Sequence, residues 1–325
     1  MYKFDVKDKK ILYELDKNAR QPLSRIAKKV NLSRESILYR LNKYKKEGII
    51  RSFLTVIDMS KLGFMHYKIN LKLHNITEAQ EKELINHLVS NPYVSWIASC
   101  DGRYSLLFAI KSRSSLEADK ILKEIDNKYW QFIKDKDIAM ITSAHHFYRD
   151  YLIGQKGTTE RKIEWGKVQE KIDIDNIDIQ ILDVLSKNSR ANAVEMAGKI
   201  KISSDAIIQR IRKLERSHII ENYMIWPNVN KLKGMYYKVL VTLHNTNEEK
   251  EKKLIAYCMQ HPNIVYVVNT LGIWQFEMDI EVKDTEEFRR VMREITSQFN
   301  DIISDYNALN IYEEHKFRFF EKGLF

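Results

Sequence analysis

The first sixty or so residues carry apolar side chains at helical spacing three times over, and a short alternating stretch follows. Pro22 opens the second predicted helix, and Ser33 is a natural N-cap for the third, which Gly48 ends. Residues 49–57 then alternate as a strand. The apolar positions that define the helices are Ile11, Leu12 and Leu15; Leu23, Ile26, Ala27 and Val30; and Ile37, Leu41 and Tyr44. This pattern predicts three helices followed by a wing strand.

The next stretch of the chain mixes alternating and helical patterns. Its predicted elements, in order, are a strand at 66–75, a helix at 78–91, a hairpin at 93–112, a helix at 116–129 and a strand at 138–148. The hairpin turns near Asp101-Gly102. The order βαββαβ predicts a ferredoxin-like arrangement.

The whole pattern occurs twice. A shift of 170 positions aligns the two halves without a gap, so that KLGFMHYKINLKLHN at 61–75 falls on KLKGMYYKVLVTLHN at 231–245. Between the halves, residues 156–172 are polar and charged, and they are expected to form a linker with some helix. The sequence therefore predicts an α+β protein made of two tandem repeats.

Charge divides unequally between the two copies of the three-helix unit. The chain holds 54 Lys+Arg against 44 Asp+Glu, a net charge of +10 that favours a polyanionic partner. Residues 1–61 contain 16 basic and 7 acidic side chains, giving +9, whereas residues 171–231 contain 10 and 8, giving +2. The first copy is therefore expected to dominate any nonspecific attraction to a polyanion.

The sequence shows no recognisable pattern of catalytic or metal chemistry. Cys100 and Cys258 are the only cysteines, which favours a reduced, cytoplasmic setting, and no apolar run predicts a membrane span. Among nine histidines, His145 and His146 are neighbours on a predicted strand, where they would point to opposite faces. We expect no catalytic residue, no metal, no cofactor and no membrane contact, and a protein that is not an enzyme.

The joint order of these motifs resembles the Lrp/AsnC (feast/famine) transcriptional regulators. The matching positions are Asp5, Asp8, Ile11, Leu12, Arg20, Ala27, Val30, Ser33 and Arg40-Leu41 in the first repeat, and Asp175, Asp178, Ile181, Leu182, Arg190, Ala197, Ile200, Ser203 and Arg210-Ile211 in the second. The resemblance covers nearly the whole chain, twice. It implies that each ferredoxin-like module is a RAM-type domain, which dimerises and often binds an amino acid or a similar effector.

This resemblance assigns a domain to each part of the chain. The expected domains are winged helix-turn-helix 1 at 1–60, RAM-like domain 1 at 61–155, the linker at 156–172, winged helix-turn-helix 2 at 173–230 and RAM-like domain 2 at 231–325. The implied partners are double-stranded DNA, a possible small-molecule effector, and further copies of the chain that assemble through the RAM-like domains.

The third helix of each unit would be the recognition helix, which fits the major groove of B-DNA. Arg34 and Arg40 have the chemistry to pair bidentately with guanine. The candidate DNA contacts are Ser33, Arg34, Ser36, Tyr39, Arg40, Lys43, Lys46 and Arg51 in the first copy, and Ser204, Gln209, Arg210 and Lys213 in the second. A solvated cationic helix is the alternative, and whether the second copy binds DNA stays open at this point.

Members of the family often carry G-x-Y-D at the hairpin turn, near the effector pocket. The candidate effector residues are Gly102, Arg103, Tyr104, Ser105, Gly272, Trp274 and Gln275. The aspartate is missing from both copies, and the two aromatic residues also suit a core or interface role. Two alternatives remain open: an enzyme like the siroheme decarboxylases, which share this architecture, and an effector-independent DNA-architectural protein.

Overall fold

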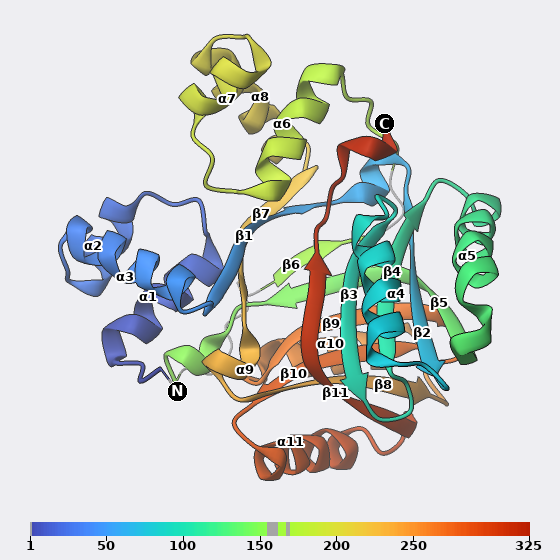
Figure 1. Ribbon diagram of the computed structural model, residues 1–325. Helices are drawn as coiled ribbons and strands as arrows, with labels where there is room; N and C mark the ends of the chain where they lie inside the picture. The colour runs from blue at the N-terminus through green and yellow to red at the C-terminus, as the bar shows by residue number, and fades with distance from the viewer. Residues whose placement is uncertain (1, 155–161, 167–169) are drawn as a thin grey trace.

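Two three-helix units stand side by side on a closed sheet in the computed structural model, which describes residues 2–154, 162–166 and 170–325 (Figure 1). The first unit comprises α1 (Val6–Lys17), α2 (Leu23–Val30), α3 (Arg34–Lys46) and the strand β1 (Ile50–Ile57). The second comprises α6 (Asn176–Lys187), α7 (Ala193–Ile200), α8 (Ser204–Arg216) and the strand β7 (Ile220–Pro227). The three-helix prediction is confirmed in both repeats.

The wing strands of the two repeats pair with each other. Strands β1 and β7 form a two-stranded antiparallel sheet in which Phe53 faces Ile225. Arg20 reaches across to donate hydrogen bonds to the carbonyls of Ser189 at 2.5 Å and Ala191 at 2.7 Å. Arg190 reciprocates with the carbonyls of Ala19 and Gln21. One polypeptide thereby forms an internal, pseudo-twofold pair of helix-turn-helix units.

Each repeat then forms a ferredoxin-like module. The first consists of β2 (Met65–Leu73), α4 (Glu78–Ser90), β3 (Val94–Asp101), β4 (Leu106–Ser112), α5 (Ser115–Tyr129) and β5 (Ile133–Phe147). The second consists of β8 (Met235–Leu243), α10 (Glu248–Gln260), β9 (Ile264–Gly272), β10 (Phe276–Val282), α11 (Thr285–Gln298) and β11 (Ile303–Phe317). Their strand orders are β3-β4-β2-β5 and β9-β10-β8-β11, as the βαββαβ pattern predicts.

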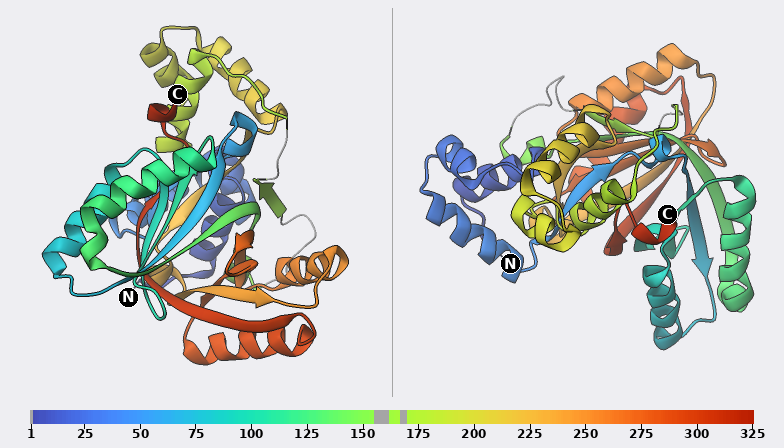
Figure 2. Two further views of the ribbon diagram at one scale, coloured as in Figure 1. Left: turned by 90° about the vertical axis from the view of Figure 1, so that its right-hand side faces the viewer. Right: turned by 90° about the horizontal axis from the view of Figure 1, so that it is seen from above.

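The two modules close on each other into one barrel-like sheet. Strand β11 pairs with β3, and β5 pairs with β9, while β5 also pairs with β2 of its own module. The helices α4, α5, α10 and α11 cover the outside, as Figure 2 shows from two further directions. Apolar cores fill the space under these helices, and a separate cluster that includes Trp96, Tyr104, Trp274 and Leu309 packs inside the ring of strands.

Short helical segments connect the main elements. They are η1 (Met59–Leu62), η2 (Trp130–Phe132), η3 (Asp150–Leu152), α9 (Val229–Leu232) and η4 (Lys322–Leu324). In the part of the chain that the structure describes, no helix combines the length and the apolar character needed to cross a bilayer.

The expectation of some helix in the linker is wrong where the structure describes it. Strand β6 (Lys162–Trp165) lies within 156–172 and pairs antiparallel with the end of β5. Ile163 and Trp165 are buried, and the Trp165 indole donates a hydrogen bond to the Tyr266 hydroxyl at 2.6 Å. The two alternating apolar residues of this short strand therefore pack against the closed sheet. The parts of the predicted linker at 156–161 and 167–169 lie outside the described residues.

Candidate functional site

Helix α3 presents a polar outer face. The Ser33 hydroxyl caps its first turn by accepting a hydrogen bond from the Ser36 amide at 3.1 Å. Ile37, Leu41 and Tyr44 are buried against the other helices of the unit. On the opposite side, the Tyr39 residue is 70% exposed. A tyrosine held open on a cationic helix is available to a partner.

Arg40 lies at the edge of that open face, in a surface pocket that Ser36, Tyr39 and Lys43 also line. Its guanidinium forms an ion pair with Asp5 at 2.9 Å and a second, shorter one with Asp8, both at the start of α1. The Tyr44 hydroxyl donates a hydrogen bond to the same Asp8 carboxylate at 2.6 Å. Asp8 is buried, so it requires these partners. Arg40 therefore ties α3 to α1, and its guanine contact stays a prediction.

The second copy repeats the same device. Arg210 in α8 pairs with Asp175 and Asp178, each at 2.8 Å. The guanidinium of Arg210 is held by the carboxylates that begin α6, and its contact with DNA likewise stays a prediction. The D-x-x-D motif and the arginine of the third helix, which the sequence shows separately, are thus two parts of one internal ion-pair cluster.

Arg51 lies on the strand that the two repeats share. Its guanidinium donates a hydrogen bond to the backbone carbonyl of Glu314 and lies 5.3 Å from the centre of the Trp226 ring. Arg51 therefore contacts the closed sheet, and its contact with DNA stays a prediction.

The remaining candidates lie on the outer surfaces of the two recognition helices. Those in α3 and its cap are Ser33, Arg34, Ser36, Tyr39, Lys43 and Lys46, and those in α8 are Ser204, Gln209 and Lys213. Of these, Ser36 and Ser204 are half-buried and the others are exposed. Sequence reasoning missed Arg212 and Arg216, which are exposed on α8 beside Lys213. The two arginines are four residues apart, a spacing that places them on the same face of a helix and could have indicated them.

The predicted effector residues stabilise the hairpins that carry them. Tyr104 is buried and its hydroxyl donates a hydrogen bond to Asp137, while the buried Trp274 donates from its indole to Glu277 at 2.9 Å. The Gln275 amide donates to the Gly272 carbonyl at 3.1 Å, and the Ser105 hydroxyl accepts from the Leu73 amide. Gly102 adopts φ +134°, which a turn of this shape reserves for glycine.

Arg103 is exposed at the same turn, where it forms an ion pair with Asp137 at 3.4 Å. None of the seven predicted effector residues lines the interior cavity described next. An effector contact at the hairpins therefore stays a prediction, whereas the packing of Tyr104 and Trp274 is that of core aromatics.

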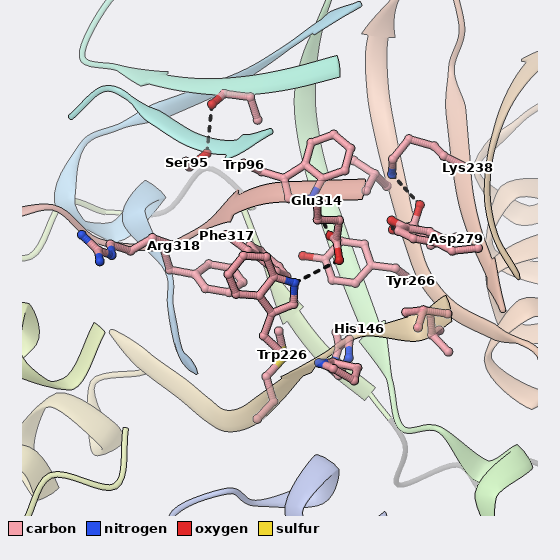
Figure 3. A pocket seen from close by; sticks show the side chains of 18 of the residues that line it. Ser95, Trp96, His146, Trp226, Lys238, Tyr266, Asp279, Glu314, Phe317 and Arg318 are labelled. Atoms are coloured by element: carbon pink, nitrogen blue, oxygen red, sulfur yellow. Dashed lines mark hydrogen bonds and ion pairs between the residues drawn. The ribbon is translucent and has the colours of Figure 1, made fainter. Parts of the chain in front are cut away.

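An interior cavity lies between the closed sheet and strand β7. Its volume is ≈ 90 Å³, and every strand from β2 to β11 contributes to its lining (Figure 3). Roughly 10–15 Å³ of such space holds one water, so the cavity accommodates a small molecule. The Glu314 carboxylate sits between two walls and accepts hydrogen bonds from the indoles of Trp96 and Trp226, each at 2.9 Å.

Strand alternation determines which histidines reach this cavity. His146 lines it, whereas its neighbour His145 does not, as expected for adjacent residues on one strand. Among the described residues, no group of three His, Cys, Asp or Glu side chains is arranged to hold a metal ion. The chemistry of the cavity therefore depends on its charged and aromatic side chains.

The three lysines that line the cavity differ in how far nearby carboxylates offset their charge. Although burial opposes its charge, Asp279 and Glu277 raise the pKa of Lys238. Burial lowers the pKa of Lys68 to about 8 and that of Lys111 to about 7. The lowered values mark positive charge that the protein compensates only in part. Such an arrangement suits an anionic ligand.

Comparison with known proteins identifies both helix-turn-helix units. A winged helix-turn-helix DNA-binding family matches residues 4–51, and the AsnC-type helix-turn-helix domain matches residues 174–215. An uncharacterised HTH-type transcriptional regulator of Pyrococcus abyssi is 31% identical over 151 residues, which are 45% of this chain and 98% of that protein. The transcriptional regulator LrpC of Bacillus subtilis is 30% identical over 115 residues, covering 35% of this chain and 77% of LrpC.

A solved structure matches the chain over its full architecture. The siroheme decarboxylase NirDL superposes with a TM-score of 0.62 at 14% identity, covering 98% of this chain and 96% of that one. At this identity the likeness shows the fold alone. The prediction that the chain is not an enzyme is nevertheless wrong as a conclusion. It relied on the absence of catalytic motifs, and an enzyme has the same architecture over the whole chain.

Both matched domains coincide with helix-turn-helix units of the structure. The regulator of Pyrococcus abyssi is covered to 98% by 151 residues, fewer than one repeat of this chain contains. The tandem duplication accounts for the fact that each single-repeat relative covers less than half of the chain. The chain belongs to the Lrp/AsnC family of helix-turn-helix transcriptional regulators.

Proposed function

We propose that the chain is a sequence-specific DNA-binding regulator that presents two unequal recognition helices from one polypeptide. The observation that carries this proposal is the open polar face of α3, with exposed Arg34 and Tyr39, on a unit that is fixed to its counterpart through β1 and β7. A pair of helix-turn-helix units held in one orientation is the usual way to read two half-sites of DNA.

The two helices take different parts in this proposal. In α3, Arg34, Ser36 and Tyr39 face the base edges, while Lys43 and Lys46 neutralise phosphates. In α8, Ser204 and Gln209 take the base-facing positions, and Arg212, Lys213 and Arg216 contact the backbone. Since the first unit carries +9 and the second +2, the first supplies most of the salt-dependent affinity.

Closure of the sheet within one chain makes the protein the equivalent of a covalent dimer. The pairings of β3 with β11 and of β5 with β9 use strand edges that two separate modules would otherwise offer to a partner. We therefore place any further assembly of whole chains on the outer helices, and the protein itself in the cytoplasm with the DNA that it regulates.

Fluorescence anisotropy with a labelled DNA duplex tests this function at several salt concentrations. We expect binding at low salt that weakens steeply as salt rises. Lys43→Ala and Lys213→Ala are matched variants at equivalent positions of α3 and α8, 170 residues apart, and the larger loss of affinity is expected for Lys43→Ala. Equal losses would refute the asymmetry, and an absence of binding at low salt would refute DNA binding.

A second candidate function is an enzyme like the siroheme decarboxylases. The observation that favours it is the full-length likeness to NirDL together with a cationic, aromatic cavity. A cavity of ≈ 90 Å³ would have to open before it admitted a tetrapyrrole. A shift of the tetrapyrrole absorbance on mixing with the protein, followed by release of carbon dioxide, would support the enzyme, and an unchanged spectrum would dismiss it.

An effector-independent DNA-architectural role is a further alternative. A regular, phased footprint over any DNA sequence would favour it, whereas protection restricted to particular sites would favour a sequence-specific regulator.

A further inference from the structure

We propose that the interior cavity binds a small aromatic carboxylate, whose anionic group is held by His66, Lys68 and Lys111. These three side chains come from β2 and β4 of the first repeat, and His66 lies directly opposite Lys111 in the pairing of the two strands. The proposal concerns a ligand of the protein alone, and it stands whether or not the chain binds DNA.

The duplication supplies an internal reference for Lys68. Its counterpart in the second repeat, 170 positions later, is Lys238, which lies opposite Asp279 on the adjacent strand and forms an ion pair with it. The residue opposite Lys68 is Ala109, the counterpart of Asp279. Within the described chain, the one carboxylate at ion-pair distance from Lys68 is Glu277, at 3.8 Å, while Asp279 and Glu314 act on it from farther away. Glu277 also lies 3.4 Å from Lys238, so Lys68 only shares it.

The same comparison applies to Lys111. Its counterpart is Glu281, which pairs with Arg149 at 2.8 Å, and Arg149 in turn pairs with Asp16 of α1 at 2.5 Å. Where Glu281 meets Arg149, Lys111 meets the counterpart of that arginine, Phe319, and donates to its backbone carbonyl. A second hydrogen bond goes to the Arg318 carbonyl at 3.1 Å. No carboxylate is recorded within ion-pair distance of Lys111 in the described residues.

His66 completes the contrast. Its counterpart Tyr236 donates a hydrogen bond to Asp279 at 2.8 Å, whereas the buried Nε2 atom of His66 has no hydrogen-bond partner among the described residues. The imidazole is 5% exposed. An unpartnered buried nitrogen is costly, and a ligand atom in the cavity would satisfy it. One half of a duplicated site is thus neutralised by ion pairs within the protein, and the other half keeps an unpartnered imidazole nitrogen beside two lysines that have no carboxylate of their own.

The walls and the size of the cavity define the rest of the ligand. Trp96, Trp165 and Trp226 line it together with Tyr266 and Phe317, so a planar, apolar body would be enclosed by rings. The Lys68 ammonium lies 4.1 Å from the centre of the Trp96 ring, next to the position of the anion. The volume of ≈ 90 Å³ limits the ligand to a single ring with its carboxylate.

Isothermal titration calorimetry with benzoate tests the proposal, with benzamide as the neutral probe of the same shape. We expect saturable binding of one benzoate per chain and binding of benzamide weaker by about tenfold or more, since a charge-assisted contact is lost. No saturable binding of benzoate, or equal affinities for the two probes, would overturn the proposal.

Ala109→Asp provides the decisive variant, because it gives Lys68 the partner that Lys238 has in the second repeat. We expect it to weaken benzoate binding by about tenfold or more while the cavity lysines stay in place. Lys72→Met, on the same strand but outside the cavity, is the matched control and should bind benzoate as the wild type does. If Ala109→Asp does not fold, as judged by circular dichroism, Lys111→Met serves in its place. Unchanged affinity in the folded variant would contradict the assignment of the anion site.

Discussion

Arg40 and Arg210 occupy equivalent positions in α3 and α8, and each forms ion pairs with the two aspartates that begin the first helix of its unit. The aspartates also accept hydrogen bonds at the helix start: the Asp5 side chain from the Asp8 amide, and Asp175 from two amides. One cluster therefore caps the first helix and fixes the angle of the third. The exposed residues of the recognition helices depend on this cluster for their placement.

Arg40→Ala should destabilise the fold rather than simply remove a DNA contact. The change leaves the Asp8 carboxylate buried with fewer partners, and because the arginine is itself a quarter exposed, the expected loss is about 1–3 kcal/mol of unfolding free energy. Urea denaturation measures it. Arg34→Ala, on the exposed face of the same helix, is the control and should change stability by less than about 0.5 kcal/mol. A fully stable Arg40→Ala protein would contradict the structural role.

Lys111 should make stability depend on pH. Burial lowers its pKa to about 7, whereas the unfolded chain keeps an ordinary value near ~10.4, so between these values the unfolded state binds more protons and stability rises with pH. From pH 7 to 8.5 the wild type should gain roughly 1–2 kcal/mol relative to Lys111→Met.

Denaturant unfolding at both pH values gives the comparison for Lys111. The charged and titratable groups that affect Lys111 are Glu321, Lys316, Arg318 and the facing His66, and all are retained in Lys111→Met. Their own titration therefore largely cancels in the difference between the two proteins. Parallel pH profiles for wild type and variant would argue that Lys111 is charged in the folded protein at pH 8.5.

At the scale of elements, the pairing of β1 with β7 defines the relation between the two helix-turn-helix units. Alternation along residues 49–57 predicted a strand, but the partner lies in the other repeat, about 170 residues away, where no local pattern indicates it. The same limit applies to β6, which was predicted as linker because four residues give too short an alternation to recognise. Helices, their caps and the strand order within each module were predictable; strand partners in the other repeat were not.

The reciprocal arginines should couple the two units. Arg20→Ala combined with Arg190→Ala removes four hydrogen bonds to the carbonyls of the opposite repeat and leaves each recognition helix intact. Affinity for a complete two-half-site DNA should fall by about tenfold or more, since part of the avidity of a fixed pair is lost. Affinity for a single half-site should not change. Equal losses on both DNAs would show that the arginines act within one unit instead.

At the scale of the whole molecule, the two repeats share one fold but differ in charge. The fold is repeated, but the helix-turn-helix charge is +9 in one copy and +2 in the other, and the cavity is neutralised on one side only. The charge difference was predictable from the sequence. The cavity was not, because its lining comes from ten strands of both repeats. The sequence shows only that both repeats have a lysine, Lys68 and Lys238, and that Ala109 stands where the second repeat has Asp279.

The central claim is that α3 is the principal reader of DNA and that α8 reads a different half-site. Selection of bound fragments from genomic DNA tests it most directly, with the wild type compared with Arg34→Ala/Tyr39→Ala in α3 and Ser204→Ala/Gln209→Ala in α8. The wild type should enrich a site with two dissimilar halves, the α3 variant should lose enrichment, and the α8 variant should retain only one half. Failure of the wild type to enrich any sequence would contradict the account.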